Sequence, residues 1–379
     1  MTQQVLSPQV TIVMSVHNGE KYLSQAVDSI LAQTFRDFEF IIINDGSTDR
    51  TSEILVQYQA RDARIRLLAQ EQSGLVDALN RGCALARGEY IARMDADDVA
   101  FPQRIEHQVK FLENNPEMAL VGTPVVVIDE NGLPIDLFRF PTDSHEIADL
   151  LMRANCINHP TVMIRTKAFC ALCGYRKTFQ HAEDYDLWLR MSEQYSLANL
   201  AEPMLCYRIH GSQVGVEHLN QLVLSMLGAR VSARGRRKDG KDPLANEAEI
   251  TPAVLENFGV TSEQIQDAYA WAFLNLLSLL LKGNPEFGMR LAAQTPQIFQ
   301  THRIAPQLQK RAAEQTLDLA NHHYSHKRFS IAKALVHLAF ALDPQLFRKA
   351  NTLRLLMKLL LGERGISFVS ILKTPIRVS

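Results

Sequence analysis

Residues 88–98 read GEYIARMDADD, and this stretch indicates the fold of the chain. Its apolar part, Tyr90–Met94, has the length of a buried β-strand, and Asp95, Asp97 and Asp98 follow closely. Similar strand-like runs occur at 10–16, 38–43 and 65–68. Between them, apolar residues recur at helical spacing in three stretches, 20–34, 49–60 and 75–86. Repeated strand–helix units predict an α/β fold, a doubly wound, mostly parallel sheet with helices on both faces.

Polar side chains follow three of these strands at the point where each strand ends. Ser15 and His17 follow the first strand, Asp45 the second and Asp95 the fourth. In parallel sheets ligands bind at the carboxyl ends of the strands, so we expect a ligand site at this edge. Asp45 can accept hydrogen bonds from a base or a ribose hydroxyl, although residues 44–47, NDGS, are also an ordinary turn sequence.

Asp95 and Asp97 form a DXD motif directly after a strand. A divalent cation such as Mn²⁺ or Mg²⁺ prefers carboxylate oxygens and offsets the charge that grows on a diphosphate leaving group. Alternating carboxylates past a buried strand can both reach one such ion. The alternative is an acidic turn, in which Asp98 caps the helix that Pro102 opens.

Glu183 and Asp184 begin another helical stretch. A carboxylate here can serve as general base for an acceptor hydroxyl, or it can stabilise the first helical turn through the helix dipole. His159, His181 and His210 lie in the same region, and each fits a packed or surface residue as well as a functional one. His210 ends an extended segment, from which it is a candidate ligand of a metal or diphosphate.

The chain changes character after Met118. Extended segments with a hairpin signal at 131–132 and helices at 143–153 and 183–195 complete a first domain, residues 1–215. For residues 216–245 the pattern predicts a helix followed by a basic linker, and 229–243 are predicted to form a loop. Residues 246–379 predict an α-helical region. There, four positions have tetratricopeptide-like spacing, typical of a helical hairpin: Leu319, Ala332, Ala339 and Pro344.

The composition is that of a globular protein: 379 residues, 46% apolar, 21% charged, with a formal net charge of −1. That charge gives no long-range attraction to nucleic acid. The first eight residues lack the apolar core of a secretory signal, and no uninterrupted run of eighteen apolar residues occurs. Five cysteines form no disulfide framework, so we expect a soluble, cytoplasmic protein. Cys170 and Cys173 form a CxxC that favours a buried structural pair over a zinc site.

Four motifs, in this order, resemble those of family 2 glycosyltransferases, which are inverting enzymes with the GT-A fold. They are VMSVHNGEKYL at 13–23, INDGSTD at 43–49, MDADD at 94–98 and EDYDLW at 183–188. The resemblance covers roughly half of the chain. It implies a metal-dependent, hexosyltransferase-like enzyme with a nucleotide diphosphate sugar as donor, commonly a uridine diphosphate sugar. The implied acceptor is a glycan or lipid-linked glycan in lipopolysaccharide, capsule or exopolysaccharide synthesis.

The same resemblance implies a role for each motif residue. Ser15, His17 and Asp45 would line the nucleotide pocket, and Asp95 with Asp97 would hold ribose, metal and diphosphate. Asp184 would be the catalytic base, and Glu183 and His159 would support it or contact the acceptor. The family usually has Tyr where this chain has His17, and often Asp where it has Asn44.

Two other functions compete with this one. A nucleotidyltransferase needs a Gly-rich, basic loop after the first strand, but residues 16–21 hold one glycine. A non-catalytic scaffold is disfavoured by the intact acids of the DXD motif and of 183–184. Residues 301–379 carry thirteen Lys and Arg against four Asp and Glu. Within them, 353–373 fits peripheral contact with an anionic membrane and equally a helix packed on the domain.

Overall fold

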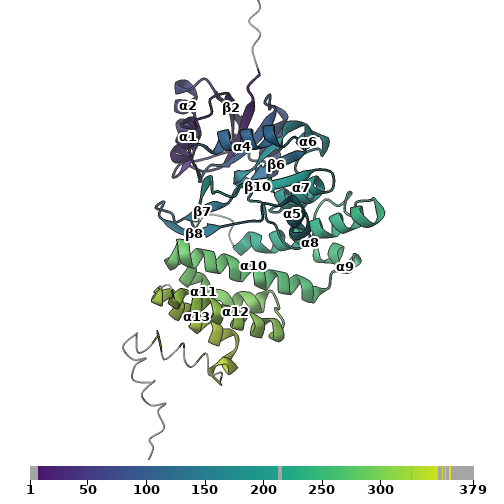
Figure 1. Cartoon of the computed structure of the whole chain (residues 1–379). Helices are drawn as coiled ribbons and strands as arrows, with labels where there is room; N and C mark the ends of the chain where they lie inside the picture. Colours follow the sequence, from purple (N-terminus) through teal and green to yellow (C-terminus); the bar gives the residue numbers. More distant parts are fainter. Residues whose placement is uncertain are drawn as a thin grey trace, which may run out of the picture. The chain divides into compact units, whose positions relative to one another are not determined.

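The structure is a computed structural model that describes residues 7–211, 216–325 and 327–348, and the single residues 352, 355, 358 and 359 (Figure 1). The chain divides into two compact units. The first contains the chain up to Arg208 together with Leu224–Phe258. The second contains Ile209–Val223 and the chain from Gly259 onward.

The first unit is built on a seven-stranded sheet with the order β10-β6-β9-β4-β1-β2-β3. Every neighbouring pair in it is parallel, except that β9 runs antiparallel to both β4 and β6. The predicted α/β fold with a mostly parallel sheet is therefore confirmed. The strands are β1 (Val10–Val16), β2 (Phe38–Asp45), β3 (Ile65–Gln70), β4 (Tyr90–Asp95), β6 (Met118–Gly122), β9 (Met163–Arg165) and β10 (Ser196–Asn199).

Helices follow the strands and pack against the sheet (Figure 1). The contact of α3 with β1 and β2 needs Gly82, because a Cβ there would lie 2.6 Å from Ile43 Cδ1. The helices up to β11 are α1 (Leu23–Leu31), α2 (Thr51–Arg61), α3 (Leu75–Ala84), α4 (Arg104–Asn114), α5 (Ser144–Leu151), α6 (Thr166–Ala171) and α7 (Glu183–Ser192), with 3₁₀ turns η1 (His159–Thr161) and η2 (Lys177–Phe179). The helices expected at 20–34, 49–60, 75–86, 143–153 and 183–195 all form, within a few residues of the predicted ends.

Strand β2 is buried along its whole length, as its apolar sequence predicts. Its one acidic interior residue, Glu39, is 3% exposed and is neutralised by two arginines. Arg66 and Arg87 lie 2.9 and 2.7 Å from its Oε2, and the Thr11 hydroxyl donates to Oε1. These contacts are at the amino-terminal half of β2, away from the edge where Asp45 lies.

A smaller four-stranded sheet, with the order β5-β11-β7-β8, completes the first unit. It consists of β5 (Val99–Ala100), β7 (Val125–Ile128), β8 (Pro134–Phe138) and β11 (Leu205–Arg208). The hairpin signal at Asn131-Gly132 is confirmed, because β7 and β8 pair antiparallel across that turn. Gly132 takes φ 88° there, a conformation that glycine adopts without steric cost.

The basic stretch 229–243 was predicted to be a loop, and that prediction is wrong for most of its length. Helix α8 spans Val216–Asp239, and ion pairs hold its last turn to Glu193 and the loop after it to Arg176. Arg236 lies 2.8 Å from both Glu193 and Asp242, and Asp242 also pairs with Arg176 at 2.6 Å. Two of the charges in this stretch, Arg236 and Asp242, are therefore partners in ion pairs within the first unit.

The second unit is helical, as expected for the later part of the chain. Helices α12 and α13 pack on each other and form the hairpin predicted around Leu319–Pro344, with α10 and α11 packed beside them. Its kinship to tetratricopeptide repeats stays a prediction. The helices after α8 are α9 (Pro252–Asn257, in the first unit), α10 (Ser262–Gly283), α11 (Pro285–Thr301), α12 (Pro306–Ser325) and α13 (Phe329–Leu342), followed by η3 (Pro344–Arg348).

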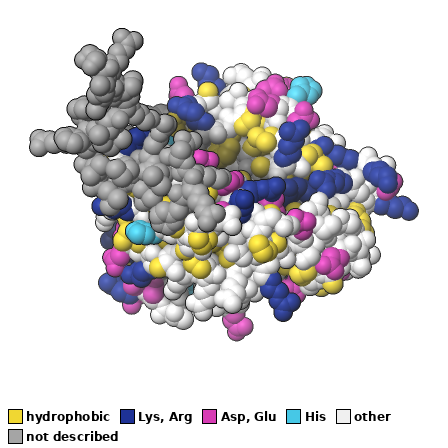
Figure 2. Space-filling view, turned by 90° about the horizontal axis from the view of Figure 1, so that it is seen from below, with side chains coloured by type: hydrophobic (Ala, Val, Ile, Leu, Met, Phe, Trp, Pro, Cys, Tyr) yellow, Lys and Arg dark blue, Asp and Glu magenta, His cyan; other side chains and the backbone are white. Residues whose placement is uncertain are grey.

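The sequence predicts no membrane-spanning segment. Among the described residues, no helix combines the length and the apolar character needed to cross a membrane. On the face in Figure 2, Lys and Arg side chains form a row, and hydrophobic side chains are scattered in small groups.

Cys170 and Cys173 are both exposed, so the prediction that they form a buried pair is wrong. The turn after α6 carries Cys173 outward at φ 57°.

We predict that Asp186→Asn lowers the free energy of unfolding by about 3 kcal/mol. Asp186 is fully buried and accepts hydrogen bonds from Arg176 and Arg190, at 2.9 Å in each case from Nε. The neutral amide would leave the buried Arg190 guanidinium without its counter-charge, while Arg176 would keep its ion pair with Asp242. Urea denaturation measures the loss. Glu53→Gln, which breaks an exposed pair with Arg50, should change stability by less than about 0.5 kcal/mol.

Candidate active site

Three strands of the main sheet end at the same level, and their ends carry the predicted site residues. In the register of β1 with its neighbours, Ser15 lies opposite Asp95 of β4 and opposite Ile43 of β2. Asp45 is the last residue of β2, and Asp95 is the last residue of β4. The structure thus brings Ser15, Asp45 and Asp95 to one edge of the sheet.

The loop after β1 is tied to the loop after β2 by side-chain hydrogen bonds. Asn18, at φ 52°, donates its backbone N–H to Ser47 Oγ and accepts from Thr48 N–H at 2.8 Å. Gly19 N–H donates to Thr51 Oγ1 at 2.9 Å. These bonds hold the two motifs, HNG and DGST, as one rigid rim.

His17 lies on that rim with an exposed ring. Its Nδ1 is 2.8 Å from the carbonyl oxygen of Asp45, which can only accept, so Nδ1 carries a proton. Its Nε2 lies 3.2 Å from the side-chain amide of Asn18, a donor, and therefore acts as the acceptor. The ring is held in one orientation with a face open to solvent, which suits stacking on a nucleobase.

Asp45 is 3% exposed and anchors the loop between β3 and α3. It accepts from Gln70 Nε2 at 2.7 Å, from Ser73 N–H at 2.9 Å and from Gly74 N–H at 2.9 Å. Burial by itself raises the pKa of Asp45, but these donors outweigh it and the pKa is lowered. The neighbouring Gly46 has φ 69°, and a Cβ there would lie 2.6 Å from Gln72 N. This explains the glycine of the NDGS motif.

The DXD motif forms a compact acidic cluster. One carboxylate oxygen from each of Asp95, Asp97 and Asp98 lies within 4.8 Å of the others. Asp98 is fully buried and accepts from Arg208 N–H at 2.9 Å through Oδ1, while its buried Oδ2 has no hydrogen-bond partner among the described residues. Asp98 therefore ties β11 to the DXD motif and does not cap α4, which begins at Arg104. Converging carboxylate oxygens, one of them unsatisfied, fit a hard divalent cation.

The three carboxylates perturb one another. Burial raises the pKa of Asp95; the Arg93 guanidinium opposes that rise, and the charge of Asp97 adds to it. Burial, then Asp97 and Asp95, raise the pKa of Asp98 well above its ordinary value. Clustered acids in a buried site are costly unless a cation neutralises them, so the arrangement favours cation binding.

Two buried arginines lie next to the acidic cluster. Arg93 is 4% exposed and forms an ion pair with Asp95. Arg104 is fully buried, donates to the carbonyl oxygen of Arg93 at 2.6 Å and to Gln108 Oε1 at 3.2 Å, and burial lowers its pKa to about 9. Our sequence analysis missed both, although a charge inside the apolar run YIARM was a signal for Arg93.

The acidic pair at the start of α7 lies in a second part of the site. Glu183 is 5% exposed, and burial together with the charge of Asp184 raises its pKa to about 7. Asp184 is partly buried and accepts from Tyr185 N–H at 2.6 Å and from Asn155 Nδ2 at 2.9 Å. Burial raises the pKa of Asp184, and these two donors oppose the rise. Sequence reasoning did not single out Asn155 itself.

The three predicted histidines lie in different surroundings. His159, in η1, places Nε2 2.8 Å from Tyr175 Oη and contacts Trp188 edge-on. Burial, aided by the charge of Arg93, lowers the pKa of His159 well below its ordinary value, so it is neutral at pH 7. His181 has φ 67° just before α7. His210 lies two residues beyond β11, in the stretch assigned to the second unit, and its role as a metal ligand stays a prediction.

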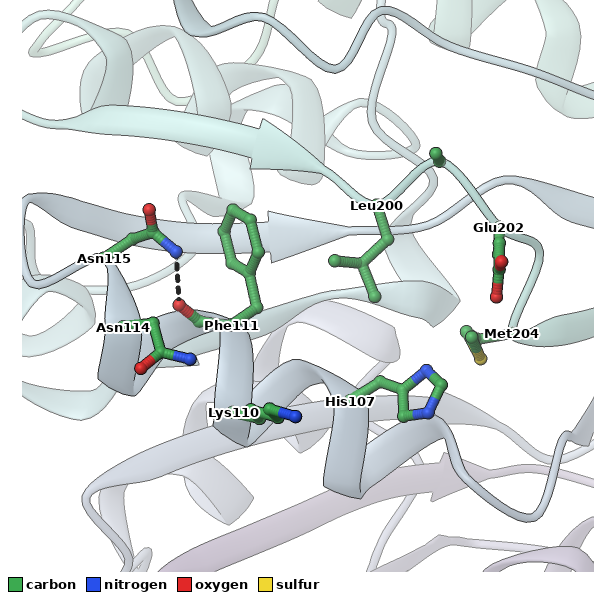
Figure 3. Close-up of a pocket in the computed structure, with 9 residues that line it drawn as sticks. His107, Lys110, Phe111, Asn114, Asn115, Leu200, Glu202 and Met204 are labelled. Carbon is green, nitrogen blue, oxygen red and sulfur yellow. Dashed lines mark hydrogen bonds between the residues drawn. The ribbon is translucent and has the colours of Figure 1, made fainter.

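A separate pocket of about 410 Å³ lies on the first unit between α4 and the chain that joins β10 to β11. Figure 3 shows His107, Lys110 and Phe111 from α4 on one side and Leu200, Glu202 and Met204 on the other. None of the predicted site residues lines it. The pocket is therefore distinct from the edge where the three strands end.

The sequence is similar to that of known glycosyltransferases. Residues 11–169 match the family Glycosyl transferase family 2. The O-antigen biosynthesis glycosyltransferase WbnJ of Escherichia coli is 38% identical over 205 residues, 53% of this chain and 80% of WbnJ. An uncharacterized glycosyltransferase of Haemophilus influenzae is 33% identical over 216 residues, 54% of this chain and 67% of that protein.

Solved structures show a more distant likeness. A crystal structure of residues 1–349 of TarS from S. aureus, in complex with UDP, has 16% sequence identity and a TM-score of 0.46. The match covers 78% of this chain and 87% of that one.

We predict that Asp45→Asn lowers the free energy of unfolding by about 2 kcal/mol at pH 7, because an amide N–H would face the N–H donors of the 70–74 loop. The pKa of Asp45 is lower in the folded chain than its ordinary 3.8. Its stabilising effect is therefore complete above that value and is lost as the pH falls through the folded pKa.

Urea denaturation at pH 7 and in steps below about pH 4 checks both statements. The deficit of the variant should shrink only in the acid range. Asp149→Asn, at an exposed position, should differ from the parent by less than about 0.5 kcal/mol at every pH. A deficit for Asp45→Asn that does not vary with pH would contradict the assignment.

Proposed function

The chain belongs to glycosyltransferase family 2, and from that premise we propose that it transfers a sugar, with inversion, from a uridine diphosphate sugar to an acceptor hydroxyl. The observation that carries this proposal is the meeting of Ser15, Asp45 and the DXD acids at one edge of the sheet. We infer that the nucleotide occupies this edge. His17 would stack on the base, and Ser15, Asp45 and Asp95 would contact base and ribose.

The acidic cluster supports a metal-dependent reaction. Asp97 would be the principal protein ligand, assisted by Asp95, and His210 is proposed as a further ligand. A divalent cation, Mn²⁺ or Mg²⁺, when bound there would offset the charge that develops on the diphosphate leaving group. Asp98, through Arg208 N–H, keeps the motif fixed to β11, so the ligand oxygens need little rearrangement.

Asp184 is the proposed general base. As the acceptor oxygen forms its bond to the anomeric carbon, that carbon's bond to the diphosphate oxygen breaks, and the hydroxyl proton passes to Asp184. Asn155 and Tyr185 N–H hold the carboxylate in one orientation. The raised pKa of Asp184 makes it a stronger base than an ordinary aspartate. Glu183 and His159 would support this side of the site or contact the acceptor.

The biological setting is proposed from the relatives. WbnJ is described as an O-antigen biosynthesis glycosyltransferase, so we propose a glycan or lipid-linked glycan as acceptor and a role in surface polysaccharide synthesis. Reaction on such an acceptor fits a cytoplasmic enzyme with peripheral membrane contact. The basic residues beyond 353, which the sequence suggested for this contact, lie mostly outside the described residues.

The nucleotide is tested by calorimetric titration of the full chain with UDP, GDP and CDP, first with Mn²⁺ and then with chelator. We expect binding of UDP that weakens at least about tenfold when the metal is removed. Absence of binding by any nucleotide to the folded chain would favour the scaffold alternative.

The roles of the two acids are separated by a pair of variants. Asp97→Ala should lose the metal-dependent part of UDP binding. Asp184→Asn should bind UDP and Mn²⁺ as the parent does, yet release UDP from UDP-sugars about 10²-fold or more slowly, with or without glycan acceptors. Glu53→Gln, at an exposed position on α2, should match the parent in both assays. Normal turnover by Asp184→Asn would remove the base assignment.

A further inference from the structure

Arg93 lies between the two acidic parts of the site. It is the fourth residue of β4, and its backbone N–H donates to Val162 O at 2.9 Å, just past η1. Its side chain projects from the same face of the sheet as Val13, its partner in the β1–β4 register, and α3 packs on that face. At 4% exposure the guanidinium is almost removed from water.

The hydrogen bonds of Arg93 are incomplete. Its ion pair with Asp95 is its one side-chain contact with an acid among the described residues, and its buried Nε has no hydrogen-bond partner. An unsatisfied buried guanidinium is costly unless nearby negative charge compensates it. Arg104 differs, because its side chain bonds to Gln108, Met94 and the backbone of Arg93 within the core.

The compensating charge comes from both motifs. Asp95 and Asp98 stabilise the charged form of Arg93, and Arg93 in turn favours the ionised forms of Glu183 and Asp184. It also disfavours a charge on His159. Water screens the charge of a buried guanidinium poorly. The charge of Arg93 therefore acts both on Asp95 and Asp98 and on Glu183 and Asp184.

A short segment connects Arg93 mechanically to the proposed base. Residues 155–162 run from Asn155, whose amide bonds to Asp184 Oδ2, to Val162, whose carbonyl bonds to Arg93 N–H. His159, midway along it, bonds to Tyr175. The bond to Val162 is made by the backbone of Arg93, so a change of side chain leaves this segment in place and reaches Asp184 through the field of the guanidinium.

We propose that Arg93 is a positioning residue shared by the two acidic motifs: its guanidinium holds the Asp95 carboxylate on one side and stabilises the negative charge of Asp184 on the other. It links the metal-binding half of the site to the half that removes the proton. This inference rests on the proposed role of Asp184 as the base.

Removal of the positive charge should make the Asp184 proton harder to lose. The charged and titratable groups around this turn of α7 include Glu183, Tyr185 and Tyr175, Arg93 from β4, and Arg230 and Arg234 of α8, which act on Tyr185. Arg93 is the positive charge that lowers the pKa of Asp184. Its loss destabilises the carboxylate, so the titration midpoint of Asp184 should move upward.

The test is a carboxylate titration by NMR on the full chain labelled with [¹³C]aspartate, with the Asp184 signal assigned by its absence in Asp184→Asn. Arg93→Met should raise the Asp184 midpoint by about one pH unit. Arg66→Met, which removes a cation at the opposite edge of the sheet, should leave it where it is in the parent. An unchanged midpoint in folded Arg93→Met would overturn the proposal.

Arg93→Lys separates charge from structure and serves if Arg93→Met does not fold. With the charge kept, the Asp184 midpoint should stay near that of the parent, while Mn²⁺-dependent UDP binding weakens several-fold because the fork that holds Asp95 is lost. A midpoint raised in Arg93→Lys as much as in Arg93→Met would mean a merely structural role.

The titration is independent of turnover. If the parent transfers no sugar but the midpoints move as expected, the proposed function fails while the electrostatic effect of Arg93 on Asp184 stands. If UDP-sugars are consumed and the midpoints do not move, the function stands and this inference fails.

Discussion

The parallel pairing of β1 with β2 on one side and β4 on the other is the constraint on which the rest of the structure depends. Its register ends three strands at one level, and each strand is buried, so the polar groups at its end need partners close by. The loops supply them: Asn18 and Ser47 bond across the rim, and Asp45 bonds to the 70–74 loop. The proposed glycosyltransferase site at this edge is thus built from loops that are held in place by the ends of the strands.

Charge is distributed unevenly around that edge. The DXD acids lie within 4.8 Å of one another, and the buried Arg93 pairs with Asp95. By contrast, Asp186 beneath the α7 acids is paired with Arg176 and Arg190. Asp186, with two arginines beside it, holds the fold together, whereas three carboxylates clustered this closely are where an added cation would lower the free energy most.

The sequence predicted most of the residues that contact ligand in our proposal, but it did not predict the residues that hold those side chains in place. Asp45 and Asp95 stand directly after apolar runs, so their place at a strand end follows from local pattern. Asn155, the partner of Asp184, comes from a stretch with no periodicity, 29 residues away in the chain. Arg93 had a local signal, a charge in an apolar strand, but nothing in the sequence said which acids it would face.

The sequence by itself determined the alternation of strands and helices, the edge where the acids gather and the helical character of the later chain, because each of these depends on the spacing of apolar residues over one element. Only the tertiary structure decided that most of 229–243 is helix with Arg236 paired to Glu193, that Cys170 and Cys173 are exposed, and that the buried Arg93 pairs with Asp95. Burial and ion pairing depend on contacts between residues that are far apart in the chain, and the local sequence pattern does not specify those contacts.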